Sequence, residues 1–165
     1  MQVLSRLYRR GKDTPDRRVL DRITRDFSWT SGGSSTQQNW ETLLSREWLV
    51  TNGLGAYASG TVSGAPTRRF HGVLIAALPT PHGRTMMLND VSEEVRLSNG
   101  ETFDLGGEET NTGITNFRAV SHLQAFRLEA GIPLWIYRFH EDSLEKRIHL
   151  VNRQNTAHVG YTWRG

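Results

Sequence analysis

The 165-residue sequence predicts an all-β protein built as an antiparallel β-sandwich. Apolar and polar side chains alternate with a period of two in several short segments, as they do in strands that bury one face. Clusters of Gly, Pro, Asn and Asp separate these segments at short intervals, which is typical of sandwiches. From Trp40 onward almost no segment has the period of an amphipathic helix.

The first predicted strands lie in the middle of the chain. The apolar run 70–78 contains β-branched residues and stops at two prolines, so it predicts a buried strand. Further strands are predicted at 84–90, 92–97 and 101–105. Asn99 and Gly100 separate the last two of these. This dipeptide predicts a hairpin with a type I′ turn, which requires positive φ at both central residues.

The C-terminal part carries four more predicted strands, at 117–130, 132–140, 143–151 and 156–164. In the third of these, every second residue from Leu144 to Leu150 is apolar except Lys146. The last strand contains Tyr161 and Trp163 and ends close to the last residue. We expect another strand to pair with it, so we expect the chain to be truncated before the natural end of the sandwich.

The sequence divides into a basic N-terminal extension, 1–40, and a sandwich domain, 41–165. Residues 1–25 contain eight Arg and Lys and three Asp, whereas the remaining 140 residues have a net charge of −2. We expect the extension to be flexible, because it is poor in apolar residues and 30–39 has the composition of a linker.

Composition also bears on partners and location. The high overall pI comes from the extension, so it gives no reason to expect that the folded part binds nucleic acid. No run approaches 18 apolar residues, so we predict no membrane span. The chain has no cysteine and no secretory signal, and we expect a cytoplasmic location.

Residues 51–72, TNGLGAYASGTVSGAPTRRFHG, have the most unusual composition. Gly53, Gly55 and Ala58 fit the loose dinucleotide pattern G-x-G-x-x-A, but Ser, Gly and Pro follow where a helix must start. The next acidic residue, Asp90, is too distant to bind a ribose, and the stretch lacks the lysine of a Walker A loop. We therefore predict that this stretch is not a phosphate-binding loop.

The candidate residues for substrate binding or for a domain interface all lie in this stretch: Asn52, Gly53, Gly55, Tyr57, Arg68, Arg69 and His71. Glycine lets the backbone approach a ligand closely, and multi-donor and aromatic side chains suit a polyhydroxylated ligand. Alternation from Phe70 places Arg69 and His71 on one side. It places Arg68 on the other, where we expect it to pair with a carboxylate of the sandwich. The alternative is a structural loop whose arginines all pair within the domain.

The sequence offers no catalytic or metal-binding constellation. The six histidines lack metal-ligand spacing, and no serine has a G-x-S-x-G frame. Adjacent carboxylates on a strand point to opposite faces, so we expect the three acidic pairs to be solvated charge: Glu93 and Glu94, Glu108 and Glu109, and Glu141 and Asp142. We predict no catalytic residue, no metal and no cofactor in this chain.

Three segments resemble the N-terminal domain of the bacterial and archaeal type of glycogen debranching enzyme. They read SREWLVTNGLGAYASGTVSGAPTRRFHGVLIAAL, GRTMMLNDVSEEV and LEKRIHLVNRQNTAHVGYTW, and the resemblance covers about residues 45–163. Three residues depart from the family's pattern: Ala56 replaces glycine, Pro66 replaces asparagine, and Phe70 replaces tyrosine. The last change removes a hydroxyl from the edge of the ring.

The resemblance implies a supersandwich-like domain that precedes an (α/α) barrel carrying the catalytic carboxylates. The parent protein would be an amylo-α-1,6-glucosidase acting on branch points of glycogen or limit dextrin, and this chain alone would be inactive. Its implied partners are an α-glucan and the barrel of the same polypeptide, which the Gly-rich stretch would face. Two other functions stay open: a stand-alone carbohydrate-binding or structural module, and the sandwich domain of another glucosidase or phosphorylase.

Overall fold

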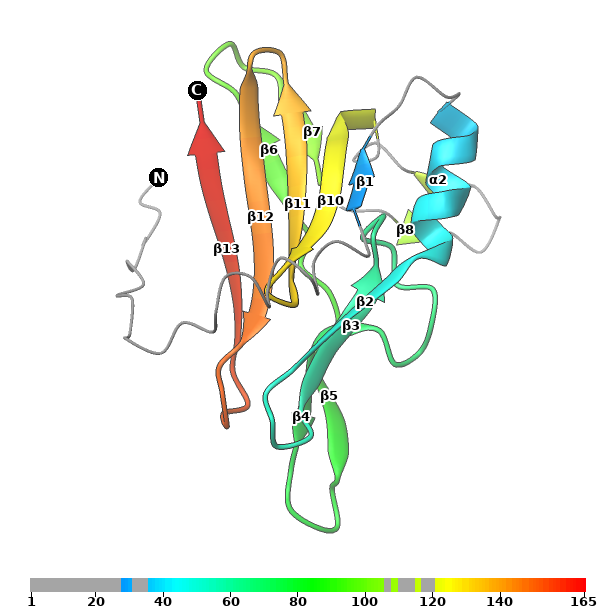
Figure 1. Cartoon of the computed structure of the whole chain (residues 1–165), viewed down its shortest axis with the longest axis vertical. Coiled ribbons are helices and arrows are strands. Elements are labelled where there is room, and N and C mark those ends of the chain that lie inside the picture. The colour runs from blue at the N-terminus through cyan, green and yellow to red at the C-terminus, as the bar shows by residue number, and fades with distance from the viewer. Residues whose placement is uncertain (1–27, 31–35, 106–107, 110–114, 117–120) are drawn as a thin grey trace.

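The computed structural model describes residues 28–30, 36–105, 108–109, 115–116 and 121–165 (Figure 1). The larger sheet has the strand order β1-β10-β11-β12-β13, with β1 (Ser28–Thr30), β10 (Leu123–Glu129), β11 (Ile132–Phe139), β12 (Asp142–Leu150) and β13 (Ala157–Arg164). The smaller sheet runs in chain order through β2 (Glu47–Thr51), β3 (Tyr57–Thr61), β4 (Gly72–Ala77) and β5 (Arg84–Leu88). Two hairpins complete the strands: β6 (Glu94–Arg96) with β7 (Thr102–Asp104), and β8 (Glu108–Glu109) with β9 (Thr115–Asn116).

Every strand pairing in the described part of the chain is antiparallel, which confirms the predicted all-β, antiparallel sandwich. The core lies between the two sheets. Trp48 of β2 meets Trp135 of β11 edge-on, with ring centroids 5.3 Å apart. The two indole N–H groups donate to the carbonyl oxygens of Thr61 (3.0 Å) and Val62 (2.8 Å), so both buried donors are satisfied.

The β6–β7 hairpin covers a second part of the larger sheet, and Figure 1 shows it lying behind β10–β12. Its Phe103 packs on Phe139 of β11 and on His122, at centroid distances of 5.0 and 4.5 Å. The hairpin was predicted at this position, but its turn type is different. Gly100 has a φ of +89°, whereas Asn99 has a negative φ. The Gly100 N–H donates to the Leu97 carbonyl, so a type I turn is followed by a left-handed glycine.

Type I′ geometry occurs instead between β10 and β11. Ala130 and Gly131, the two residues between the paired Glu129 and Ile132, both have positive φ (+54° and +77°). Alanine rarely adopts the left-handed region, so the sequence Ala-Gly does not predict a type I′ turn. The pairing of the flanking strands holds the turn in place.

Two elements lie in or across the predicted extension and linker. Ser28–Thr30 forms β1, which pairs with β10 at the edge of the larger sheet, and Thr36–Ser45 forms helix α2. The prediction of little helix after Trp40 is confirmed, and the last turn of α2 is the part of this helix that extends past Trp40. The helix has ten residues, and Leu43 is its fully buried anchor, so its pattern is too short to show a clear period. Residues 1–27 lie outside the described part of the chain.

Lys146 points into the core, as the alternation of β12 requires, and its ammonium is paired there. Its Nζ lies 2.6 Å from Oε2 of Glu93, and the two side chains are 13% and 8% exposed. The Tyr161 hydroxyl donates to the other oxygen of Glu93, and the Lys146 ammonium lies 5.5 Å from the centre of the Trp135 ring. The prediction that Glu93 is solvated is wrong, because it neutralises a lysine that the strand register forces inward. Glu94 is exposed.

Candidate functional site

The loop between β2 and β3 is organised by Asn52, which is buried. Its Oδ1 accepts hydrogen bonds from the N–H groups of Leu54 (2.8 Å) and Ala56 (3.1 Å), and its Nδ2 donates to the Gln154 carbonyl (2.9 Å). Gly53 and Gly55 take positive φ values inside this loop. The structure thus uses the side chain of Asn52 to shape the loop.

The 151–156 loop between β12 and β13 contacts both sheets. The Arg153 N–H donates to the Asn52 carbonyl at 2.8 Å. Asn155 makes a two-way amide contact with Ala77 at the end of β4: its Oδ1 accepts from the Ala77 N–H, and its Nδ2 donates to the Ala77 carbonyl (3.0 and 2.9 Å). These bonds fix the start of the Gly-rich stretch and the end of β4 against the loop that joins β12 and β13.

Residues 68–71 form a turn, and strand β4 begins only at Gly72. The His71 N–H donates to the Arg68 carbonyl at 2.9 Å, and the Ser59 hydroxyl donates to the Phe70 carbonyl at 3.2 Å. The predicted alternation from Phe70 is therefore wrong at this point. The turn brings Arg68 and His71 to the same side, and Arg69 is exposed elsewhere.

Arg68 and His71 both face Glu47 at the start of β2. The Arg68 guanidinium forms an ion pair with Oε1 of Glu47, in agreement with the expected carboxylate partner. His71 is 1% exposed, and its Nδ1 accepts from the Thr67 N–H at 3.2 Å. The neutral ring therefore carries its proton on Nε2, which lies 3.5 Å from the same Oε1 and makes no hydrogen bond. Burial lowers the pKa of His71.

Tyr57 lies on the same side of the smaller sheet as Glu47, because the odd-numbered residues of β2 pair with those of β3. The Arg84 guanidinium lies 5.7 Å from the centre of the Tyr57 ring. The Arg84 Nε donates to the Gly55 carbonyl at 3.1 Å, which holds the guanidinium in place.

These residues surround a groove of about 410 Å³ on the outer side of the smaller sheet. We name this site the open-face groove and define it by six of its lining residues: Glu47, Leu49, Tyr57, Phe70, His71 and Arg84. The sequence prediction included Tyr57 and His71. It missed Glu47 and Arg84, since an isolated carboxylate on a strand and an arginine 27 residues after Tyr57 carry no local signal.

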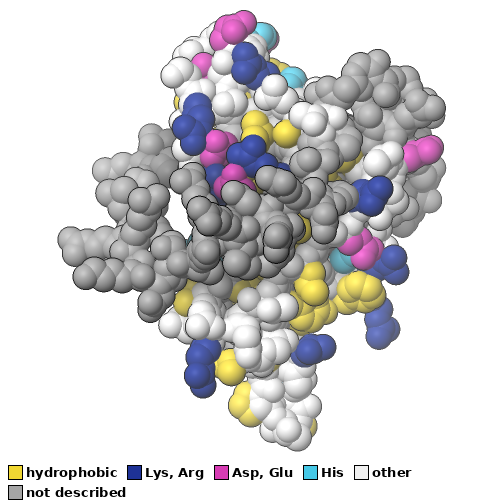
Figure 2. Space-filling view, in the orientation of Figure 1, with side chains coloured by type: hydrophobic (Ala, Val, Ile, Leu, Met, Phe, Trp, Pro, Cys, Tyr) yellow, Lys and Arg dark blue, Asp and Glu magenta, His cyan; other side chains and the backbone are white. Residues whose placement is uncertain are grey.

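The outer side of the smaller sheet is also unusually apolar. We name this surface the open face. It consists of Tyr57 and of three exposed apolar side chains, Leu49 (59% exposed), Phe70 (46%) and Met86 (37%). Figure 2 shows hydrophobic side chains gathered over the lower part of the molecule, where β2–β5 lie, with Arg and Lys beside them. Contiguous exposed apolar surface marks an interaction site more often than isolated exposed residues do.

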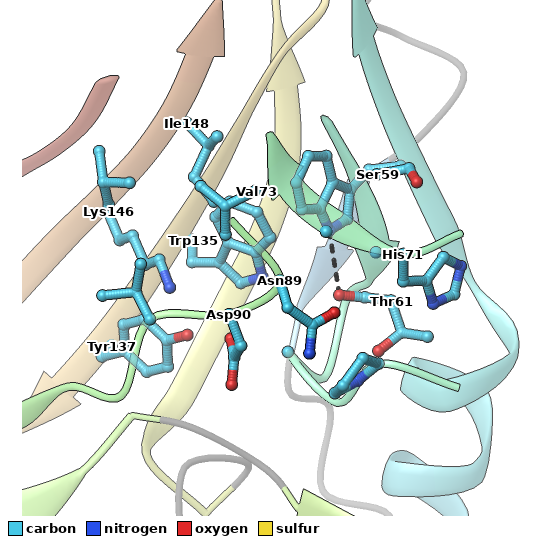
Figure 3. A pocket seen from close by; sticks show the side chains of 17 residues that line it. Ser59, Thr61, His71, Val73, Asn89, Asp90, Trp135, Tyr137, Lys146 and Ile148 are labelled. Carbon is cyan, nitrogen blue, oxygen red and sulfur yellow. Dashed lines mark hydrogen bonds between the residues drawn. The ribbon is translucent and has the colours of Figure 1, made fainter. Parts of the chain in front are cut away.

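A second cavity lies inside the sandwich and has a volume of about 40 Å³ (Figure 3). Side chains from both sheets line it, among them Thr61, Asn89, Trp135 and Lys146. This volume accommodates about one water molecule and no sugar ring. The inner cavity is therefore a packing feature of the core.

Other polar clusters of the described residues offer less. No group of three or more His, Cys, Asp and Glu side chains there has the geometry of a metal site. His149 and His158 stack across β12 and β13 with centroids 5.0 Å apart, and burial together with His158 lowers the pKa of His149. Within the same residues, no helix is long and apolar enough to cross a membrane.

Comparison with known proteins identifies the family. Neither the curated proteins nor the solved structures give a match. A family model described as "Glycogen debranching enzyme N terminal" matches residues 46–165, which include β2–β13 and the whole open-face groove. On this match over most of its length, the chain belongs to the glycogen debranching enzyme N-terminal family.

Proposed function

We propose that this chain is the N-terminal module of an amylo-α-1,6-glucosidase, an enzyme that hydrolyses α-1,6-glucosidic branch points of glycogen or limit dextrin. The family match over residues 46–165 carries the proposal. A cytoplasmic location is part of it, and the absence of cysteine from the sequence supports that location.

In this proposal the module contributes a binding surface, and the barrel of the same polypeptide contributes the catalytic carboxylates. The open face packs against that barrel and lines its glucan cleft. Support comes from Leu49, Phe70 and Met86, which leave apolar area uncovered on one side of the smaller sheet. Two carboxylates of the module, Glu47 and Glu93, are held by Arg68 and Lys146, so neither is a free general acid.

The test is an assay of glucose release from limit dextrin. The complete enzyme containing this sequence is expected to release glucose without added phosphate, whereas the purified 165-residue chain is expected to release none. Phosphate-dependent release would instead assign the module to a phosphorylase. Release by the 165-residue chain itself, abolished by Glu47→Gln or Glu93→Gln, would place the catalysis in this domain and overturn the proposal.

A further inference from the structure

We infer that the open-face groove is a subsite that binds the α-linked glucosyl units of the glucan directly. This inference rests on the proposed function for the class of ligand. It goes beyond that function by assigning the contact to Glu47, Arg84 and two aromatic rings. The groove volume of about 410 Å³ lies in the range of about 300–1,000 Å³ that small-molecule sites occupy.

The Glu47 end of the groove supplies a hydrogen-bond acceptor. The contacts of Glu47 with Arg68 and His71 both go to Oε1. Among the described residues, no hydrogen bond or ion pair reaches Oε2, and the side chain is 37% exposed. Arg68 therefore holds the carboxylate in one orientation, while its second oxygen is free to accept a charge-assisted hydrogen bond from a hydroxyl.

The Arg84 end supplies hydrogen-bond donors. Its Nε is used by the Gly55 carbonyl, and its remaining N–H groups have no partner among the described residues. The guanidinium is held over the Tyr57 ring, so little side-chain freedom is lost when a ligand binds. A hydroxyl is both donor and acceptor, and a groove with an acceptor at one end and donors at the other matches a ring with several hydroxyls.

Two aromatic rings supply the apolar surface that the C–H face of a sugar requires. Phe70 is 46% exposed, and it is held by an edge-on contact with His71 (5.5 Å) and by the Arg68 guanidinium (5.8 Å). Tyr57 contributes the second ring. Arg68 lies over one face of the Phe70 ring, so the ring offers its other face to a sugar.

Other ligands fit the groove less well. An anion such as phosphate could pair with Arg84, but it would leave the acceptor oxygen of Glu47 without a donor. A purely apolar protein surface would bury that oxygen without a partner, which is unfavourable. A neutral, hydroxyl-rich ring satisfies both ends of the groove and covers the apolar floor.

The test is titration of the 165-residue chain with maltohexaose, followed by amide and side-chain NMR and by calorimetry. We expect shifts confined to residues around Glu47, Tyr57, Phe70 and Arg84. Glu47→Gln is expected to weaken binding at least tenfold, because its amide NH₂ takes the position of the free acceptor. Phe70→Ala and Arg84→Ala are expected to weaken binding by a similar factor.

Matched controls separate this result from unfolding and from unspecific binding. Arg96→Ala removes an exposed arginine from the β6–β7 hairpin and is expected to leave maltohexaose binding unchanged. Cellohexaose has the same units in β linkage and is expected to bind at least fivefold more weakly. Each variant must keep the wild-type circular dichroism spectrum.

Two outcomes would overturn the inference. In the first, maltohexaose shifts no groove resonance at millimolar concentration. In the second, it shifts residues elsewhere, and the three groove variants bind normally. An enzyme that debranches limit dextrin while its module shows either outcome retains the proposed function and loses only the subsite. If the module binds maltohexaose but the enzyme has no α-1,6 activity, the subsite is retained and the proposed function is lost.

Discussion

His71 is a buried imidazole whose environment favours its neutral form. Nδ1 is occupied by the Thr67 N–H, Nε2 has no hydrogen-bond partner, and the side chain is 1% exposed. Glu47 lies on one side of the ring and favours protonation, while Arg68 opposes it, and burial is the largest effect. The pKa of His71 is therefore lowered below the value of about 6.5 that an exposed histidine has.

This lowered pKa predicts a pH dependence of stability. As the pH falls below about 6.5, the unfolded chain takes up a proton that the folded His71 does not, so the free energy of unfolding decreases. The contribution is complete above that pH and is lost as the pH falls through the folded pKa. Urea unfolding between pH 5 and 7.5 is expected to show a slope of up to about 1.4 kcal/mol per pH unit from this residue.

The matched variant is His71→Asn, whose side-chain oxygen can still accept from the Thr67 N–H but does not titrate. Its free energy of unfolding is expected to depend less steeply on pH, while His149, whose pKa is also lowered, contributes equally to both proteins. Identical slopes in the two proteins would show that the pKa of His71 is the same in the folded and unfolded states, which would contradict the prediction.

For single residues, the sequence predicted which groups pair better than it predicted the side of the sheet on which each side chain lies. The carboxylate partner of Arg68 was expected, because a guanidinium beside a strand needs an acceptor. The expected grouping of Arg69 with His71 was wrong, because the hydrogen bond from His71 to the Arg68 carbonyl closes a turn and shifts the start of the strand to Gly72. A one- or two-residue error in a strand boundary reverses the side on which a residue is placed.

At the scale of the element, β12 shows how a strand tolerates a charge on its buried face. The register with β11 and β13 places Lys146 opposite Trp135 and Tyr161. Among the described residues, Glu93 from the segment before β6 is the carboxylate that neutralises it there. Burial, together with the negative charge of Glu93, raises the pKa of Tyr137, so this neighbour stays protonated.

Removing one partner of this pair is expected to be costly. Lys146→Met leaves the Glu93 carboxylate buried with only the Tyr161 hydroxyl, and we expect a loss of about 3–5 kcal/mol in urea unfolding. The double variant Lys146→Met with Glu93→Gln removes both charges and is expected to recover most of that loss. Arg96→Met breaks the exposed pair with Glu94 (3.9 Å) and serves as the control, with little change expected. A double variant as unstable as Lys146→Met would assign the loss to packing.

Elements with a strong period were predictable, and those held by tertiary contacts were not. Strands β11, β12 and β13 lie within one or two residues of their predicted limits, because their alternation spans eight or nine residues. Helix α2 has ten residues and β1 has three, so neither carries enough pattern to be recognised. The turn at Ala130 and Gly131 lacks the Asn-Gly signal, whereas the true Asn-Gly pair forms a different turn.

At the scale of the whole molecule, the open face is an apolar surface that no other described element covers. Leu49, Phe70 and Met86 are exposed on one side of a sheet whose other side forms the core. The expectation that the Gly-rich stretch faces another domain stays a prediction, and exposed apolar area of this kind is typical of interaction surfaces. The groove itself could not be predicted from the sequence, because Glu47 and Arg84, its two polar ends, lie on β2 and β5, the two edge strands of the smaller sheet.

The proposed docking of the open face on the barrel predicts that the effect of Leu49→Asp differs between the 165-residue chain and the complete enzyme. In the 165-residue chain the side chain is exposed, so the free energy of unfolding is expected to change by no more than about 0.5 kcal/mol. In the complete enzyme the same change is expected to weaken the contact by about 2–3 kcal/mol, the value for burying a leucine, and to lower the melting temperature. Thr102→Asp, an exposed substitution on β7, is the control. Equal melting temperatures for the wild-type and Leu49→Asp complete enzymes would contradict docking through this face.

The 151–156 loop has a consequence for the order in which the domain opens. Arg153 and Gln154 hold the β2–β3 loop through Asn52, and Asn155 holds the end of β4 through Ala77. Both contacts lie at the same end of the smaller sheet, because Tyr57 pairs with Ile75, so the loop ties this end to the connection between β12 and β13. The domain therefore has few independent subglobal openings in this region, and the amides of Ala77 and Arg153 reach solvent through a shared event. We therefore expect hydrogen exchange at these two amides to report the same free energy of opening.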